Sequence, residues 1–219
     1  MHLKKKLVSL ALAAALLASV PVSALASPAF NSQVLDGYND IIINNDDITG
    51  VTYIQPSAIL GYTLMTRPTA HTAVAVEPYI TLTDPADFFD IKFHLHGYDR
   101  ANLNMIAIKI GDNRYIFSNC TYRFSLYDDG TSYESIILPI KKETLPFMND
   151  FVTHKNDEIK VRLIGSFSQY DFVLPDAMKN AICELYNLYI SAGALSQSNF
   201  NLISAVDETI VTRNGTILS

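Results

Sequence analysis

Alternation of apolar and polar residues constrains the fold of this chain more than any other feature. Between residues 89 and 96 the apolar members of the alternation are Phe89, Ile91, Phe93 and Leu95. Successive side chains of a strand point to opposite faces of a sheet, so this pattern predicts a strand with one buried face. The same period of two recurs at Ile106–Ile110, Tyr122–Leu126 and Ile159–Leu163. The chain is therefore predicted to be rich in β-structure.

Two short polar segments predict tight reversals between these strands. Gly111, Asp112 and Asn113 separate the apolar run at 106–110 from the one at 115–117, and residues 128–130, Asp-Asp-Gly, precede the run at 133–140. Glycine and the short polar side chains favour the backbone conformations of hairpin turns. We expect the two hairpins to join in a four-strand antiparallel meander.

One segment changes to a helical period. From Met178 to Ala192 the apolar residues recur every three to four positions, and Gly193 follows as a stop signal. The only partner for its apolar stripe is the apolar face of a sheet. The expected fold class is α+β: an antiparallel β-sheet meander, sandwich-like or half-barrel-like, packed by one long C-terminal amphipathic helix.

The N-terminus has the pattern of a secretory signal peptide over residues 1–26. Three lysines precede an apolar run from Leu7 to Val20, and Ala24-Leu25-Ala26 supplies the small residues that signal peptidase recognises. Cleavage near Ala26 would release a secreted protein, extracellular or periplasmic, and no later run approaches the length of a membrane span. Residues 27–50, rich in Asn, Asp, Ser and Gly, are expected to form a flexible N-terminal arm with one edge strand at the short run Ile41-Ile42-Ile43. Residues 51–219 are expected to form a single domain.

Removing the signal peptide makes the charge strongly acidic. The full chain has 16 Lys and Arg against 22 Asp and Glu, for a net charge of −6. Lys4, Lys5 and Lys6 leave with residues 1–26 and no acidic residue does, so the mature net charge is −9. This balance argues against nucleic acid or an anionic membrane surface as the main partner.

Two cysteines, Cys120 and Cys183, offer two readings. In an oxidising compartment they can form one disulfide that closes a long loop. Alternatively, both are small buried hydrophobic residues, since free cysteine is among the most buried residue types. No catalytic cysteine signature surrounds either of them.

His94 and His96 are the candidate metal ligands. Alternate residues of a strand share a face, so both imidazoles can reach one zinc or copper ion, with His71, His154 or Asp99 as a third ligand. The other reading places both histidines on the solvated face of a half-buried strand. Calcium is a second candidate cofactor, because Asn44–Asp47 and Asp128–Asp129 offer oxygen ligands, although turn chemistry also explains these residues.

Familiar enzyme signatures are missing from the sequence. It contains no nucleophile-elbow motif, phosphate-binding glycine-rich loop or His-Glu-x-x-His. The leading hypothesis is a secreted, non-enzymatic binding domain for a protein, glycan or cell-surface partner. The many tyrosines are consistent with two roles: they can form contacts with such a partner, or they can cover the sheet edges and the rim of the core. The alternatives are a metal-dependent extracellular hydrolase that uses His94 and His96, and a structural or assembly subunit whose N-terminal arm adds a strand to a neighbour.

Overall fold

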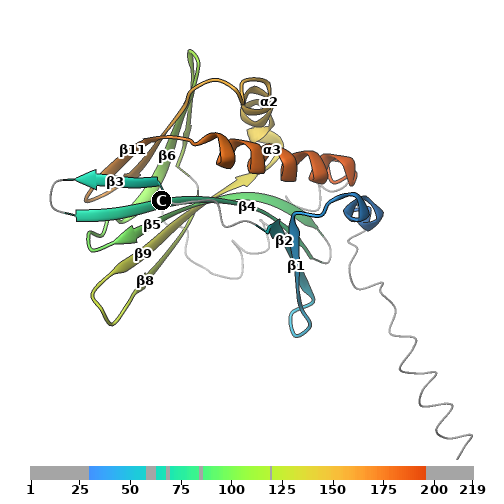
Figure 1. Ribbon diagram of the computed structural model, residues 1–219, viewed down its shortest axis with the longest axis horizontal. Coiled ribbons are helices and arrows are strands. Elements are labelled where there is room, and N and C mark those ends of the chain that lie inside the picture. Colours follow the sequence, from blue (N-terminus) through green and yellow to red (C-terminus); the bar gives the residue numbers. More distant parts are fainter. Residues whose placement is uncertain (1–29, 58–62, 68–69, 84–85, 119, 196–219) are drawn as a thin grey trace, which may run out of the picture.

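Two antiparallel sheets and a layer of helices make up the structure, which is a computed structural model (Figure 1). It describes residues 30–57, 63–67, 70–83, 86–118 and 120–195. The signal peptide expected at 1–26 lies outside the described residues. Among the described residues, no helix has the length and apolar character that crossing a membrane requires.

Sheet A has seven strands and sheet B has four. Sheet A follows the order β1-β2-β4-β5-β9-β8, with β3 paired to β4, and its strands are β1 Ile41–Asp46, β2 Val51–Pro56, β3 Thr63–Arg67, β4 Ala70–Leu82, β5 Asp87–Gly97, β8 Thr121–Leu126 and β9 Ser132–Ile140. Sheet B follows the order β11-β10-β6-β7, and its strands are β6 Leu103–Ile110, β7 Asn113–Phe117, β10 Ile159–Gly165 and β11 Gln169–Val173. Every pairing in both sheets is antiparallel.

Two α-helices and two short 3₁₀ turns complete the described chain. Their bounds are η2 Ser32–Gly37, η3 Lys142–Thr144, α2 Leu145–Thr153 and α3 Asp176–Ser191. Proline stands in the first turn of α2, where its missing N–H costs nothing. The 16-residue α3 lies across one face of sheet A and contacts β2, β4 and β5 (Figure 1).

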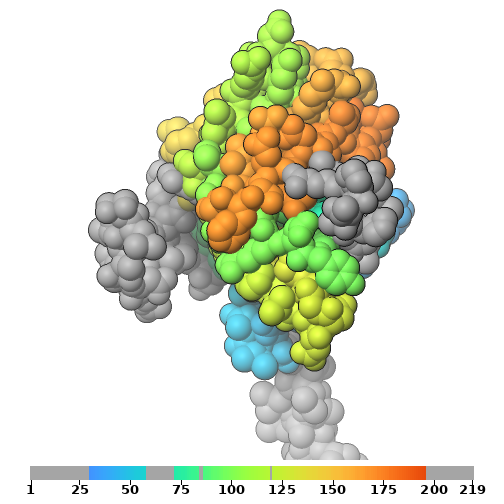
Figure 2. Space-filling model, turned by 90° about the vertical axis from the view of Figure 1, so that its left-hand side faces the viewer, coloured from blue at the N-terminus to red at the C-terminus, as the bar shows by residue number. Residues whose placement is uncertain are grey.

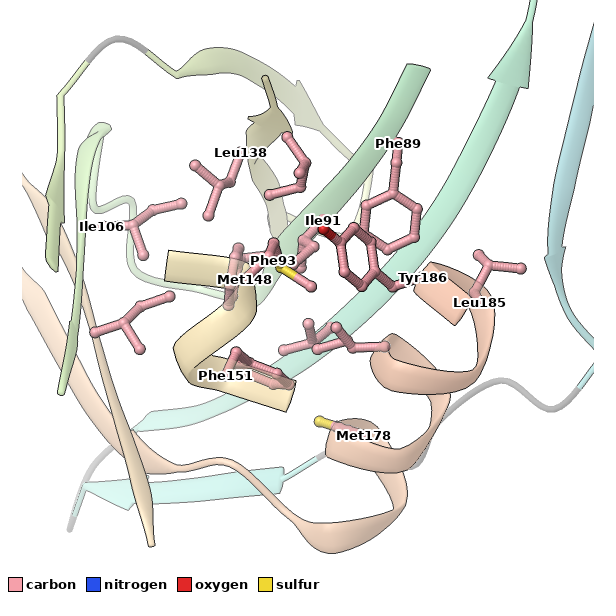
Figure 3. Close-up of a cluster of buried hydrophobic side chains, with 14 of the residues drawn as sticks. Phe89, Ile91, Phe93, Ile106, Leu138, Met148, Phe151, Met178, Leu185 and Tyr186 are labelled. Atoms are coloured by element: carbon pink, nitrogen blue, oxygen red, sulfur yellow. The ribbon is translucent and has the colours of Figure 1, made fainter. Parts of the chain in front are cut away.

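The core fills the space between the two sheets and the helices. Figure 3 shows Phe89, Ile91 and Phe93 of β5 pointing toward side chains of α2 and α3, with Ile106 of sheet B nearby. The Phe89 ring lies 5.4 Å from Tyr186 and 5.7 Å from Tyr189, both on α3. The residues whose alternation predicted β5 are thus the ones that join sheet A to the helical layer.

The structure confirms an α+β fold built on antiparallel sheets, but the single meander is wrong. The hairpins β6–β7 and β8–β9 form as expected, yet β7 and β8 do not pair and the two hairpins belong to different sheets. The helical layer contains α2 as well as the 16-residue α3, so packing by one long C-terminal helix is not confirmed. Over the described residues, the fold is therefore two sheets that enclose a core together with α2 and α3.

Aromatic packing explains why the hairpins separate. Tyr115 and Phe117 of β7 pack edge-on against Phe147 of α2 at 5.3 and 5.2 Å. Tyr122 of β8 donates instead to Glu134 of β9. The β6–β7 hairpin packs on an aromatic side chain of α2, whereas the β8–β9 hairpin is held by a hydrogen bond to Glu134. The chain therefore passes from one sheet to the other between β7 and β8.

The segment expected to be a flexible arm contains two elements of structure. Phe30 is buried in the core, and the Asn31 N–H donates to the Ala192 carbonyl at 2.8 Å. Strand β1 pairs with β2 and forms one edge of sheet A. The described part of the arm, residues 30–50, is therefore attached at both the core and the sheet edge.

Two backbone segments approach each other closely where β10 ends and β6 begins in sheet B. Gly165 ends β10 against the loop that precedes β6, and a Cβ at this position would overlap the Ala101 carbonyl. The loop is held by two backbone hydrogen bonds, from Ser166 to Asn102 and from Phe167 to Ala101. Only glycine allows this approach without movement of the backbone.

Gly165→Ala is expected to destabilise the protein by about 1–3 kcal/mol, because the new methyl group meets backbone atoms that cannot rotate away. Urea unfolding followed by circular dichroism measures the change. Gly37→Ala is the matched control, since a Cβ there meets nothing within 4 Å. Equal unfolding midpoints for the two variants would contradict the close backbone approach at Gly165.

Candidate binding surface

The outer face of sheet B is an exposed hollow of about 700 Å³. Alternation directs one set of side chains into the core, including Ile106, Ile108, Val161 and Phe172. The opposite set lines the hollow: Ala107, Lys109, Arg114, Ile116, Lys160, Arg162, Asp171 and Val173. Figure 2 views the side of the molecule where the green β6–β7 and orange β10–β11 segments lie together. We call this set the sheet B face.

Strand register arranges the sheet B face in two rows across the strands. One row runs Asp171, Arg162, Ala107 and Ile116, and the second runs Val173, Lys160, Lys109 and Arg114. Neighbouring strands lie about 4.8 Å apart, and the two rows are separated by two residues along each strand, about 6.8 Å. Three cations therefore stand side by side on three adjacent strands.

The charges of the two rows differ in how they are compensated. Asp171 accepts two hydrogen bonds from the Arg162 guanidinium, each 2.6 Å long, and these hold the pKa of Asp171 below its usual value. Lys160 lies 2.9 Å from the carboxylate of Glu158. Within the described part of the chain, Lys109 and Arg114 have no ion pair or side-chain hydrogen bond. Like charges directly opposite one another on paired strands disfavour each other, and neither member of this pair is bonded to a carboxylate within the described residues.

Exposed apolar side chains lie beside these cations. Ile116 is 69% exposed and Val173 is 47% exposed. The short side chain of Ala107 leaves a depression in the surface between its longer neighbours in the row. A hollow that combines exposed aliphatic groups with cations has the chemistry of an interaction surface. Sequence reasoning missed this surface, because its residues come from two segments about fifty residues apart that only the register brings together.

The structure places the predicted metal ligands His94 and His96 on one face of β5, but in different surroundings. His94 is buried; its Nε2 lies 2.9 Å from the Glu77 carboxylate and its Nδ1 contacts the Tyr133 hydroxyl. His96 is exposed, with its ring 5.9 Å from that of Tyr127. Within the described residues, no three His, Cys, Asp or Glu side chains are grouped as metal ligands. The metal role of this pair remains a prediction.

Aspartates considered for calcium act within their own turns. Asp46 accepts hydrogen bonds from the backbone of Ile48 and Thr49 at 3.0 and 3.2 Å. Asp129 accepts from the backbone and the hydroxyl of Thr131 at 2.9 and 2.6 Å. Hydrogen bonding to the side chain of Thr49, and then to the backbone of Thr49 and Ile48, lowers the pKa of Asp46, and the hydrogen bonds from Thr131 lower the pKa of Asp129. Turn chemistry therefore explains both residues.

The tyrosines do not gather on one exposed face in the described chain. Tyr170 is buried, and Tyr115 and Tyr122 are half-buried with their hydroxyls bonded to Asp150 and Glu134, whereas Tyr98 and Tyr127 are exposed. Most of them therefore cover the core and its rim, which is the second of the two roles considered from the sequence.

Cys120 and Cys183 are free thiols in this structure. Cys183 is buried on α3 and Cys120 is half-buried between β7 and β8, and both pack against the hydrophobic core. Burial raises the pKa of the Cys120 thiol to about 11 and is the largest cause that raises the pKa of Cys183. The two residues occupy the positions of small hydrophobic side chains, and the disulfide remains a prediction for the oxidised protein.

Both thiols are expected to react slowly with Ellman's reagent in the folded protein. At pH 8 the Cys120 thiol, with a pKa of about 11, is ionised to roughly one part in a thousand, and burial also raises the pKa of the Cys183 thiol and shields it from the reagent. Unfolding in guanidinium without a reductant should release two reactive thiols per chain. Fewer than two after unfolding would contradict the free-thiol state, and none would indicate the bridge.

The hydrogen bond from His94 is the main cause that holds the pKa of Glu77 below the ordinary 4.5. A carboxyl whose pKa is lower in the folded state contributes stability above its unfolded pKa, and this contribution is lost as pH falls through the folded value. Glu77→Gln should therefore reduce the loss of stability on acidification from about pH 6 to about pH 3. Urea midpoints across this range measure it, with Glu143→Gln, an exposed glutamate on η3, as control. Parallel pH profiles for wild type and Glu77→Gln would contradict the interaction.

Comparison with known protein families and with curated protein sequences finds no match for this chain. Any functional assignment therefore depends on the geometry of the surfaces described above.

Proposed function

We propose that this protein is an extracellular or periplasmic binding domain and that the sheet B face is its binding surface. The observation that carries the proposal is the pair Lys109 and Arg114, two cations placed opposite each other beside the exposed Ile116. Repulsion between them lowers stability, and a bound partner with negative charge would relieve it. Location outside the cytoplasm follows from the signal peptide pattern at residues 1–26.

The rigidity of the scaffold supports the same proposal. The cations stand on paired strands whose opposite sides are buried in the core, so their backbone positions are fixed before a partner arrives. A preformed surface loses little conformational entropy on binding. The face needs no rearrangement to accept a partner of matching shape and charge.

An assembly subunit is the second candidate. Strand β1 forms an edge of sheet A, and Ile42 and Ile43 on it are each about 40% exposed. Exposed edge strands pair readily with a strand of another chain. In this candidate the partner would be a second copy of the chain, bound through sheet A. The hydrolase that uses His94 and His96 has less support, since both ring nitrogens of His94 already contact other side chains.

A photo-crosslinking amino acid at position 116 should give a discrete product with a partner from the extracellular fraction of the source organism, because Ile116 stands 69% exposed in the sheet B face. The same substitution at Ile190, an exposed residue of α3, is the control and should give none. Gel electrophoresis and mass spectrometry identify the product.

Two results would contradict the proposal. Equal products from positions 116 and 190 would show that the sheet B face has no special role. A product made only of two copies of this chain would favour the assembly subunit.

A further inference from the structure

We infer that the sheet B face binds an acidic, extended polypeptide segment in which a carboxylate and an aliphatic side chain are two residues apart. This inference rests on the proposed function and names the chemistry of its partner. The carboxylate binds between Lys109 and Arg114, and the aliphatic side chain rests on Ala107 beside Ile116.

Charge complementarity specifies the first contact. Lys109 and Arg114 face each other across the β6–β7 pair, and both lack a carboxylate partner among the described residues. A single carboxylate placed between them would bind both and remove their mutual repulsion. Most other charged residues of this chain are acidic, so the pair forms a positively charged site on a protein of negative net charge. The contact therefore selects for Asp or Glu.

The row spacing specifies the second contact. The row that contains Ala107 and Ile116 lies two residues along the strands from the row that contains Lys109 and Arg114. In an extended segment, side chains two residues apart point the same way and are also about 6.8 Å apart. A segment that runs along the strands thus presents one side chain to each row, and the apolar row selects an aliphatic one.

The remaining charges disfavour polyphosphates and sulfated glycans. Asp171 and Glu158 place carboxylates beside Arg162 and Lys160, which compensates those two cations. A polymer with a negative charge at every unit would meet both carboxylates, and it would leave Ile116 and Val173 without an apolar contact. A peptide with spaced carboxylates avoids both penalties.

Two twelve-residue peptides of identical composition test the inference on the chain purified from its expressing cells. The first repeats Glu-Ser-Val-Ser, which puts Glu and Val on one face of an extended segment; the second repeats Glu-Val-Ser-Ser, which puts them on opposite faces. Calorimetry should give at least tenfold tighter binding for the first. Its binding should weaken at least tenfold in Lys109→Glu/Arg114→Glu and stay unchanged in Lys142→Glu/Lys155→Glu, a pair of exposed lysines with the same change of charge.

Three outcomes overturn the inference: equal affinity for the two peptides, no binding of the first at millimolar concentration, or tighter binding of a sulfated polysaccharide than of either peptide. Circular dichroism of each variant confirms that it is folded. If the product from position 116 still forms while the peptides fail, only the chemistry of the partner is wrong. If that product is absent as well, the proposed function falls too.

Discussion

The buried carboxyl group of Glu134 fixes how the two sheets meet. It is 1% exposed on β9 of sheet A, and its oxygens accept hydrogen bonds from the backbone N–H groups of Ala101 and Leu103 and from the Tyr122 hydroxyl. A buried carboxyl group without partners would cost several kcal/mol, so the three donors are required where they are. Two of them lie at the first residue of β6 and in the loop just before it. One side chain therefore sets the position of sheet B relative to sheet A.

The same junction is closed from the other side by the β10–β11 turn. Asn102 adopts a positive φ of 56°, and Ser166 accepts hydrogen bonds from the side-chain amides of Asn102 and Asn104 at 3.2 and 3.3 Å. Gly165 allows the two backbones to cross at this point. These contacts hold the start of β6 to the end of β10, and the register of the β6–β10 pair gives the cations on their outer face a defined spacing before any partner binds.

Local features of the sequence predicted the elements, and long-range pairing decided their arrangement. Alternation from Phe89 to Leu95 located β5, and the turn residues near Gly111 and Gly130 located both hairpins. Nothing local indicated that Tyr115 would pack on α2 while Tyr122 would bind Glu134, so the hairpins were wrongly joined in one meander.

Glu134 and the sheet B face both show that local sequence patterns do not reveal which distant residues the fold brings together. A glutamate in an alternating strand is normally placed on the solvated side, but Glu134 is directed inward by donors from a loop about thirty residues away. Lys109 and Lys160 each look like an ordinary polar position of a half-buried strand. Only the β6–β10 register reveals that they are neighbours in a row that also includes Arg114.

The outer faces of the two sheets differ in what they leave for a partner. On sheet A, Glu77 binds His94 at 2.9 Å and Lys92 at 3.5 Å, and His94 also contacts Tyr133, so these polar groups satisfy one another within the fold. Any ligand there would first have to break those contacts, and their loss would offset its own binding energy. On sheet B, Lys109 and Arg114 give up no partner among the described residues when an anion binds, and their repulsion is relieved. A bound carboxylate would therefore displace fewer existing contacts on sheet B than on sheet A. This difference favours the sheet B face over the histidine pair as the proposed binding site, although the histidine pair is the more conspicuous motif in the sequence.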